Sequence, residues 1–398
     1  MGRCHSYPAH QCDNCLVTTL EELVEDMALL LEAPCTLEDA EFRLIGFSDQ
    51  RGRAAVDTVR QRSILERGSS AEVRDWFHGH GIREAAGPVR TPTDDARGIV
   101  GRLCVPARHR GRVYGYFWLL DPDNTIDERL WPEAGRIAEA AAELLDLVER
   151  RQERRDALFR ELVEGVTAAR LSATELAAAG GLDVHEPVRC VLVQRPELAE
   201  QVASRPTRPG VVWARAGAGT CAAVVRASLL PATAALPDVL TALGLSRRVA
   251  DLDRATHVAV GPTVRGFDEL ASAHTGALVA LRVARAGAGG AVVDWTSLGP
   301  LTLLAVARDG DLAWSLIPPS LARFLREATP EVLETARVFL DEAGSASRTA
   351  QRLAVHRQTV YHRLSQVERR SGCDLSSGED RLRLHLALRL APFVLDPV

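Results

Sequence analysis

The chain has 398 residues, which is too long for one ordinary domain and predicts two or three. Its 46% apolar and 25% charged residues are typical of a globular protein, and its net charge is −5 with arginine as the only basic residue. No stretch approaches twenty apolar residues, and residues 1–5 lack the apolar core of a signal peptide, which argues against a membrane or secreted protein. We therefore expect a cytoplasmic protein without a membrane partner, with its eight cysteines reduced.

Near the beginning of the chain, Cys12 and Cys15 have the spacing of half a zinc site, and Cys4 with His10 could complete four ligands. Structural zinc sites usually use two separated knuckles, so we predict no metal and no cofactor. A metal- or redox-responsive binding protein remains an alternative. The other cysteines stand among apolar residues and are predicted to be buried thiols: Cys35, Cys104, Cys190, Cys221 and Cys373.

Residues 18–148 show the pattern of one α/β domain. We expect helices and strands in this order: a helix over 20–31, a strand over 40–47, helices over 57–66 and 70–78, and a hairpin of strands 101–106 and 113–120. A long helix then follows. This layout resembles that of GAF and PAS domains and implies a GAF-like sensor. Tyr114, Tyr116 and Trp118 alternate along the last strand, where they could line a ligand pocket, although we favour core packing.

The long helix is predicted from residue 132 to about 167, and residues 149–180 would link the first domain to the next. Apolar residues recur at helical spacing along it and could form the seam of a parallel dimer. The charged run 149–155 interrupts this stripe, and the alternative is a simple solvated face.

The middle region, residues 181–310, has strand patterns followed by a helix over 271–284. The expected strands are 188–193, 210–213, 221–225 and 258–262. Three segments, 258–261, 273–281 and 292–299, resemble a degenerate GGDEF-like domain. Cyclases of that type use a Gly-Gly-acid-Glu-Phe turn and metal-binding carboxylates, whereas the connecting segment 214–220 contains no acid. We therefore predict a non-enzymatic relay domain without catalytic residues, and keep a nucleotide-signalling enzyme as an alternative.

The C-terminal region has the pattern of a helix-turn-helix. Thr329 and Pro330 open one helix, Gly344 follows it, and Ser347 could cap the next. Ala350 is small enough for close helix approach, and Val355 lies in the turn. In the second helix, about 357–370, the inward-facing positions are predicted to be Val360, Leu364 and Val367.

The opposite face of that helix is polar, as a base-reading surface must be. We predict that Gln358, Thr359 and His362 contact bases. Arg357, Tyr361 and Arg363 on its flanks would contact phosphates. Residues 344–370 contain six arginines against one glutamate, a formal charge of +5 in a chain whose net charge is negative. The alternative is a helical hairpin with a solvated arginine face.

Four motifs in this region resemble the C-terminal helix-turn-helix of the PucR family of bacterial regulators. They are Thr349-Ala-Gln-Arg-Leu, Val355-His-Arg-Gln-Thr, Tyr361-His-Arg-Leu and Gly372-Cys-Asp-Leu, and residues 379–388 resemble the closing helix of the family. Gln358 stands where the family usually has Asn, which puts the base preference at that position in doubt but not the fold.

The resemblance implies an α+β multi-domain chain in which a GAF-like sensor and a GGDEF-like domain precede a DNA-binding domain over residues 329–398. It implies a sequence-specific transcriptional regulator that binds double-stranded DNA. We expect a homodimer controlled by an unknown small-molecule effector.

Overall fold

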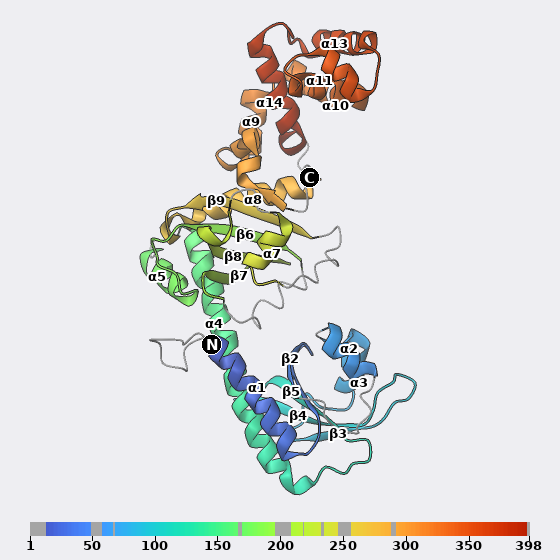
Figure 1. Ribbon diagram of the computed structural model, residues 1–398, viewed down its shortest axis with the longest axis vertical. Coiled ribbons are helices and arrows are strands. Elements are labelled where there is room, and N and C mark those ends of the chain that lie inside the picture. Colours follow the sequence, from blue (N-terminus) through green and yellow to red (C-terminus); the bar gives the residue numbers. More distant parts are fainter. Residues whose placement is uncertain are drawn as a thin grey trace. The chain divides into compact units, whose positions relative to one another are not determined.

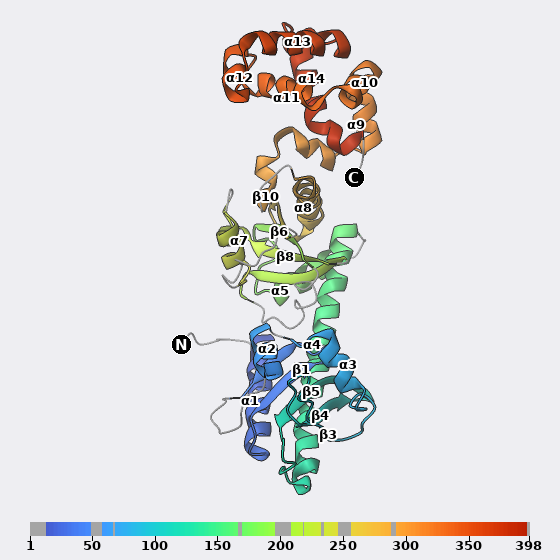
Figure 2. The same ribbon diagram turned by 90° about the vertical axis from the view of Figure 1, so that its right-hand side faces the viewer.

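The computed structural model describes residues 13–48, 58–66, 68–165, 169–195, 208–217, 219–231, 235–245, 256–287 and 292–395. Contacts divide the chain into two compact units. The first holds one five-stranded sheet, and the second holds most of another sheet and all the helices that follow it (Figures 1 and 2). No helix among the described residues is long and apolar enough to cross a membrane.

The first unit is an antiparallel sheet with helices on both faces. Its elements are α1 (Asp13–Leu30), β1 (Cys35–Asp39), β2 (Leu44–Phe47), α2 (Thr58–Glu66), α3 (Ala71–His78), β3 (Val89–Thr91), β4 (Arg102–His109), β5 (Arg112–Leu120), the 3-10 turn η1 (Glu128–Leu130) and α4 (Trp131–Glu164). The strand order is β2-β1-β5-β4-β3. The predicted helices and the hairpin are therefore confirmed, with small shifts at their ends.

The strand predicted over residues 40–47 is confirmed for its second half, which is β2, and is wrong for residues 40–42, where the chain turns. Phe42 has a positive φ of 61°, and the side chain of Asp39 accepts hydrogen bonds from the backbone N–H groups of Glu41 and Arg43 at 2.9 Å each. This local capping by an aspartate breaks the apolar run and separates β1 from β2. The apolar pattern alone did not indicate β1.

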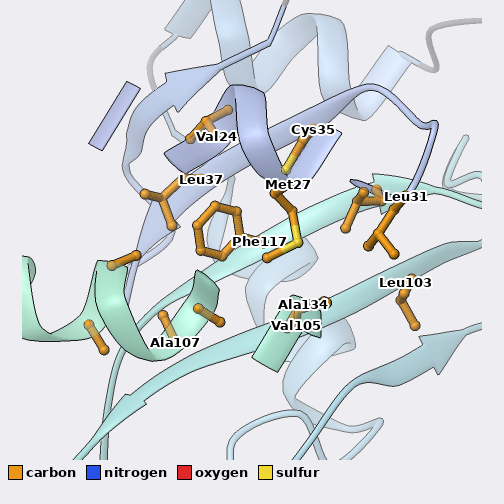
Figure 3. Close-up of a cluster of buried hydrophobic side chains, with 14 of the residues drawn as sticks. Val24, Met27, Leu31, Cys35, Leu37, Leu103, Val105, Ala107, Phe117 and Ala134 are labelled. Carbon is orange, nitrogen blue, oxygen red and sulfur yellow. The ribbon is translucent and has the colours of Figure 1, made fainter. Parts of the chain in front are cut away.

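One face of the first sheet is packed with aliphatic side chains. Helix α1 contributes Val24 and Met27, and the strands contribute Leu37 and Phe117, as Figure 3 shows. Helix α4 contributes only alanines to the cluster of buried residues, including Ala134, which lets its backbone lie close to the sheet. Ala141, one of the apolar residues that recur at helical spacing along the long helix, is also buried in this cluster, so this residue packs inside the chain and not in a dimer seam.

The other face of the sheet holds a cluster of aromatic rings. Tyr116 and Trp118 are 1% and 2% exposed, and Trp118 lies 4.5 Å from the Phe77 ring and 5.6 Å from the Phe42 ring, centroid to centroid. These two strand aromatics therefore pack in the core, as we favoured. Tyr114 instead packs against the aliphatic cluster on the opposite face, and its hydroxyl donates to Asp146 of α4 at 2.7 Å.

The charged run in α4 is not simply a solvated face. Gln152 is fully buried, and Asp156 is 7% exposed. The carboxylate of Asp156 accepts hydrogen bonds from Gln152 Nε2 at 2.6 Å and from the backbone N–H of Arg215 at 2.8 Å. Where the apolar stripe of α4 is interrupted, buried polar side chains therefore form hydrogen bonds within the chain.

The second sheet has the strand order β10-β9-β6-β8-β7. The elements of this region are α5 (Ala169–Ala179), β6 (Val188–Gln194), β7 (Val211–Gly217), β8 (Thr220–Arg226), η3 (Ala227–Leu229), α7 (Leu236–Ala242), β9 (His257–Val264), η5 (Phe267–Glu269), α8 (Leu270–Arg285), β10 (Val292–Asp294), η6 (Trp295–Ser297) and η7 (Gly299–Ala305). Strand β6 pairs antiparallel with β8 and β9, and β10 runs parallel to β9. The four strands and the helix predicted here are confirmed.

A buried arginine joins three strands of this sheet. Arg189 of β6 is 1% exposed, and its guanidinium donates to the carbonyl oxygen of Gly261 in β9 at 2.8 and 3.0 Å. It also donates to the carboxylate of Asp294 in β10 at 2.8 Å. A buried charge of this kind is tolerated only when it is paired and hydrogen-bonded, as it is here.

The chain ends in a bundle of helices that begins with two helices not predicted from the sequence. These are α9 (Asp309–Leu316) and α10 (Pro319–Glu327). The others are α11 (Pro330–Asp341), α12 (Ala346–Leu353), α13 (Arg357–Ser371) and α14 (Gly378–Val394). The expected helix-turn-helix elements are thus present, and α13 ends one residue beyond the predicted end.

The buried acid Glu38 makes the first unit sensitive to pH. Burial raises the pKa of Glu38 to about 7, although the Ser63 hydroxyl donates to its carboxylate at 2.9 Å and Arg102 lies near it. The folded state therefore holds a proton that the unfolded state has lost above about pH 4.3, so this group lowers stability as pH rises from about 4.3 to about 7.

We predict that Glu38→Gln removes the loss of folding stability that accompanies rising pH. The variant should be more stable than the natural protein at about pH 8, by roughly 1–3 kcal/mol, and nearly equal to it at about pH 5. Urea unfolding of both chains at several pH values measures the difference. Glu41→Gln, an exposed site in the neighbouring turn, is the control. A gain of the same size at both pH values would contradict the prediction.

Candidate nucleic-acid interface

The rotation of α13 about its own axis is fixed by apolar packing. Val360 and Val367 are fully buried and Leu364 is 7% exposed. They lie at spacings of four and three on the side of α13 that packs against α10 and α11. Figure 2 shows α12 leading into α13 along one side of the bundle, with α11 beneath. The three inward positions predicted from the sequence are confirmed.

The turn between α12 and α13 is tight. Ala354 has φ 51° and ψ 43°, the left-handed conformation, and its backbone N–H donates to the carbonyl of Gln351 at 3.2 Å. His356 then caps α13, since its Nδ1 accepts from the backbone N–H of Gln358 at 3.3 Å. The predicted cap of α12 is corrected by two residues: Ser345, not Ser347, accepts from the backbone N–H of Arg348. Serine stands at both positions, so the pattern alone did not distinguish them.

The outward face of α13 carries polar side chains in one row. Gln358, His362, Ser365 and Arg369 are exposed and lie four, three and four residues apart, so they share one side of the helix. Arg357 is exposed beside this row, and Tyr361 is 48% exposed.

Two of the six predicted contact residues are less accessible. Thr359 and Arg363 are half-buried, on the flank of α13 that turns toward the bundle. The guanidinium of Arg363 donates to the Thr335 hydroxyl of α11 at 3.2 Å. A backbone hydrogen bond is the largest cause of the lowered pKa of Glu331, and the positive charge of Arg363 contributes to the same lowering. Arg363 therefore also joins α13 to α11.

The arginines of α12 and α13 differ in whether an acidic side chain lies close enough to balance their charge. Arg348 and Arg352 of α12 both pair with Glu342 at 3.0 Å, and the hydrogen bond from Arg352 is the largest cause of the lowered pKa of that carboxyl. Within the part of the chain that the structure describes, Arg357 and Arg369 have no acidic partner within 4.0 Å. These two exposed cations lie at opposite ends of α13 and suit contacts with phosphate groups.

One contact on the outward face was missed by sequence reasoning. The side-chain nitrogen of Gln366 lies 2.9 Å from Nε2 of His362, one turn earlier. This interaction fixes the imidazole against the helix. The four-residue spacing of a histidine and a glutamine was a signal for it.

The metal and thiol predictions have different outcomes. Cys35, Cys104, Cys190, Cys221 and Cys373 are buried free thiols, as expected. The candidate ligands Cys4, His10 and Cys12 lie outside the described residues, and so does the side chain of Cys15. Among the residues that are described, no group of three or more His, Cys, Asp or Glu could hold a metal ion.

A family model described as the PucR C-terminal helix-turn-helix domain matches residues 332–390, which include α12, α13 and most of α11 and α14. This segment is a PucR C-terminal helix-turn-helix domain. The resemblance in the motifs is thereby confirmed for this segment.

Two relatives are similar to this chain, one along almost its whole length and the other over a short segment. The proline-responsive transcriptional activator PutR of Bacillus subtilis is 21% identical over 406 aligned positions, which span 93% of this chain and 96% of that protein. The purine catabolism regulatory protein of the same species is 44% identical over 59 positions, which are 15% of this chain and 11% of that protein. A solved regulator of polyketide synthase expression from Bifidobacterium adolescentis is 19% identical, covers 60% of this chain and 92% of that chain, and has a TM-score of 0.30.

The left-handed alanine in the turn of the PucR domain gives a stability prediction. An L-residue costs about 1–2 kcal/mol in this conformation, and glycine loses about 0.5–1 kcal/mol more entropy on folding. Ala354→Gly should therefore stabilise the domain by about 0.5–1 kcal/mol, measured by urea unfolding. Ala346→Gly in α12 is the matched control and should give no gain. Equal effects of the two substitutions would show that Ala354 is not strained.

Proposed function

We propose that this protein is a sequence-specific transcriptional regulator whose helix α13, about residues 357–370, reads the major groove of double-stranded DNA. The observation that supports this most is the two-sided character of α13. One side is buried in the bundle, and the other presents Gln358 and His362 in an exposed row with Arg357 beside it. A helix in the major groove needs such a face of hydrogen-bonding groups flanked by cations.

The proposed roles of the six residues follow from their chemistry. Gln358, Thr359 and His362 would contact base edges. Arg357, Tyr361 and Arg363 would contact phosphates. Because Thr359 and Arg363 are half-buried, Gln358 and Arg357 are the sharper probes of the two roles.

The rest of the chain would control this domain. We propose a GAF-like sensor over residues 18–148, a linking helix over 149–180 and a degenerate GGDEF-like domain over 181–310. The strand order β2-β1-β5-β4-β3 with helices on both faces supports the first assignment, and the antiparallel pairing of β6 with β8 and β9 supports the last. A match to a proline-responsive activator along almost the whole chain supports control by a small-molecule effector.

We also propose that the protein acts as a homodimer and is not an enzyme. Helix-turn-helix proteins commonly bind two half-sites about 34 Å apart, one for each subunit. The absence of acids from segment 214–220, which spans the β7–β8 connection, supports a relay role for the middle domain rather than nucleotide chemistry.

Binding to DNA fragments from around the gene of the protein tests the proposal. Fluorescence anisotropy across a salt series should show tight, salt-sensitive binding to one fragment. Gln358→Ala should cost roughly 1–3 kcal/mol and relax the preference at one base position. Arg357→Ala should weaken all sequences alike and reduce the salt slope by about 1, and Arg363→Ala should also weaken all sequences.

The matched control is Arg265→Ala, which removes an exposed cation outside the bundle and should leave DNA binding unchanged. The proposed roles are wrong if Gln358→Ala and Arg357→Ala cause equal losses with an unchanged sequence preference. Equally weak binding of the natural protein to every fragment, with or without extract from the source cells, would argue for a bundle that contacts protein instead of DNA.

A further inference from the structure

A cavity of about 450 Å³ lies where the end of α14 meets the α/β layer of the second unit. Its walls come from strands β6, β7 and β8, from the last turns of α8 and from the end of α14. Leu192 and Leu281 give it an apolar wall, and Phe393 and Pro392 close it from α14. Leu278 at its edge is 46% exposed. The cavity therefore combines the end of α14, just past the segment that matches the PucR domain, with the α/β layer of the second unit.

Two guanidinium groups line this cavity, and none of its described lining residues is an acid. Arg282 is already engaged: it forms two hydrogen bonds with the carboxylate of Asp309, at 2.7 and 2.9 Å, and donates to the carbonyl oxygen of Phe393. Arg285 donates through Nε to the side-chain oxygen of Gln194 at 2.8 Å. Within the described part of the chain, Arg285 has no acidic partner within 4.0 Å.

We propose that this cavity binds a small organic anion, a carboxylate or phosphate monoester that carries an apolar group. Its volume is within the range of about 300–1,000 Å³ that is usual for small-molecule sites. The guanidinium of Arg285 supplies the planar donors that match carboxylate and phosphate oxygens, and the leucine wall accommodates the apolar group.

A structural role for both arginines is the alternative interpretation. Cations in the last turn of a helix stabilise its free carbonyl groups, and both residues are in the last turn of α8. The role of Arg282 is structural, because its guanidinium is hydrogen-bonded to Asp309 of α9 and to the carbonyl oxygen of Phe393 in α14. Among the residues that the structure describes, Arg285 bonds a neutral side chain through Nε and has no acidic partner. Its other donors and its charge are therefore the groups that a ligand would use.

Isothermal titration calorimetry of the full chain tests the site with two probes, phenyl phosphate and benzoate, each taken into the millimolar range. At least one should bind. Arg285→Gln, which removes the charge but keeps hydrogen-bonding groups, should weaken that binding roughly tenfold or more. Leu278→Trp, at an exposed edge position, should abolish it by filling the cavity.

Arg265→Gln is the charge-matched control and should bind both probes like the natural protein. The proposal is overturned if neither probe binds, if Leu278→Trp leaves binding intact, or if Arg285→Gln and Arg265→Gln weaken it equally. Thermal unfolding of each variant verifies that it is folded. Since the titration contains no DNA, its outcome does not depend on the proposed function.

Discussion

The packing of three aliphatic side chains of α13 is the constraint on which the candidate interface depends. Val360, Leu364 and Val367 enter the core of the PucR domain, and burying each such side chain stabilises by about 1.5–3 kcal/mol. Because these three set the rotation of α13, they also decide that Gln358 and His362 are exposed. The packing that forms the core of the domain therefore also exposes the polar row of α13.

Elsewhere in the second unit, arginines form hydrogen bonds between strands and between helices. These bonds are directional, so they fix the relative positions of the elements more closely than apolar packing alone. Arg189 binds the backbone of β9 and the carboxylate of Asp294 in β10, which fixes the register of three strands from the inside. Arg282 of α8 connects helices in a similar way, because it donates hydrogen bonds to Asp309 of α9 and to the carbonyl oxygen of Phe393 in α14. A planar fork with several donors can satisfy partners on two elements at once, which the point charge of a lysine does less well.

The two faces of the first sheet illustrate how differently one sheet can be buried. The face under α1 and α4 is aliphatic, and small alanines of α4 permit close approach. The face with Phe77 and Trp118 contains aromatic rings and the buried acid Glu38. A carboxyl group kept in such surroundings costs stability at neutral pH.

The sequence by itself determined the elements whose signals are local. The helix period placed α11, α12 and α13 and their inward residues, the alternation of β4 and β5 with a short turn placed the hairpin, and the motifs identified the PucR domain. The sequence did not reveal what depends on distant partners. Arg363, expected on the outer flank, also contacts Thr335 of α11, 28 positions earlier in the chain. Arg285 and Leu192 stand 93 positions apart and line one cavity only because α8 packs on β6. Periodicity reports which side of an element is buried, but only the packed structure decides which side chains meet.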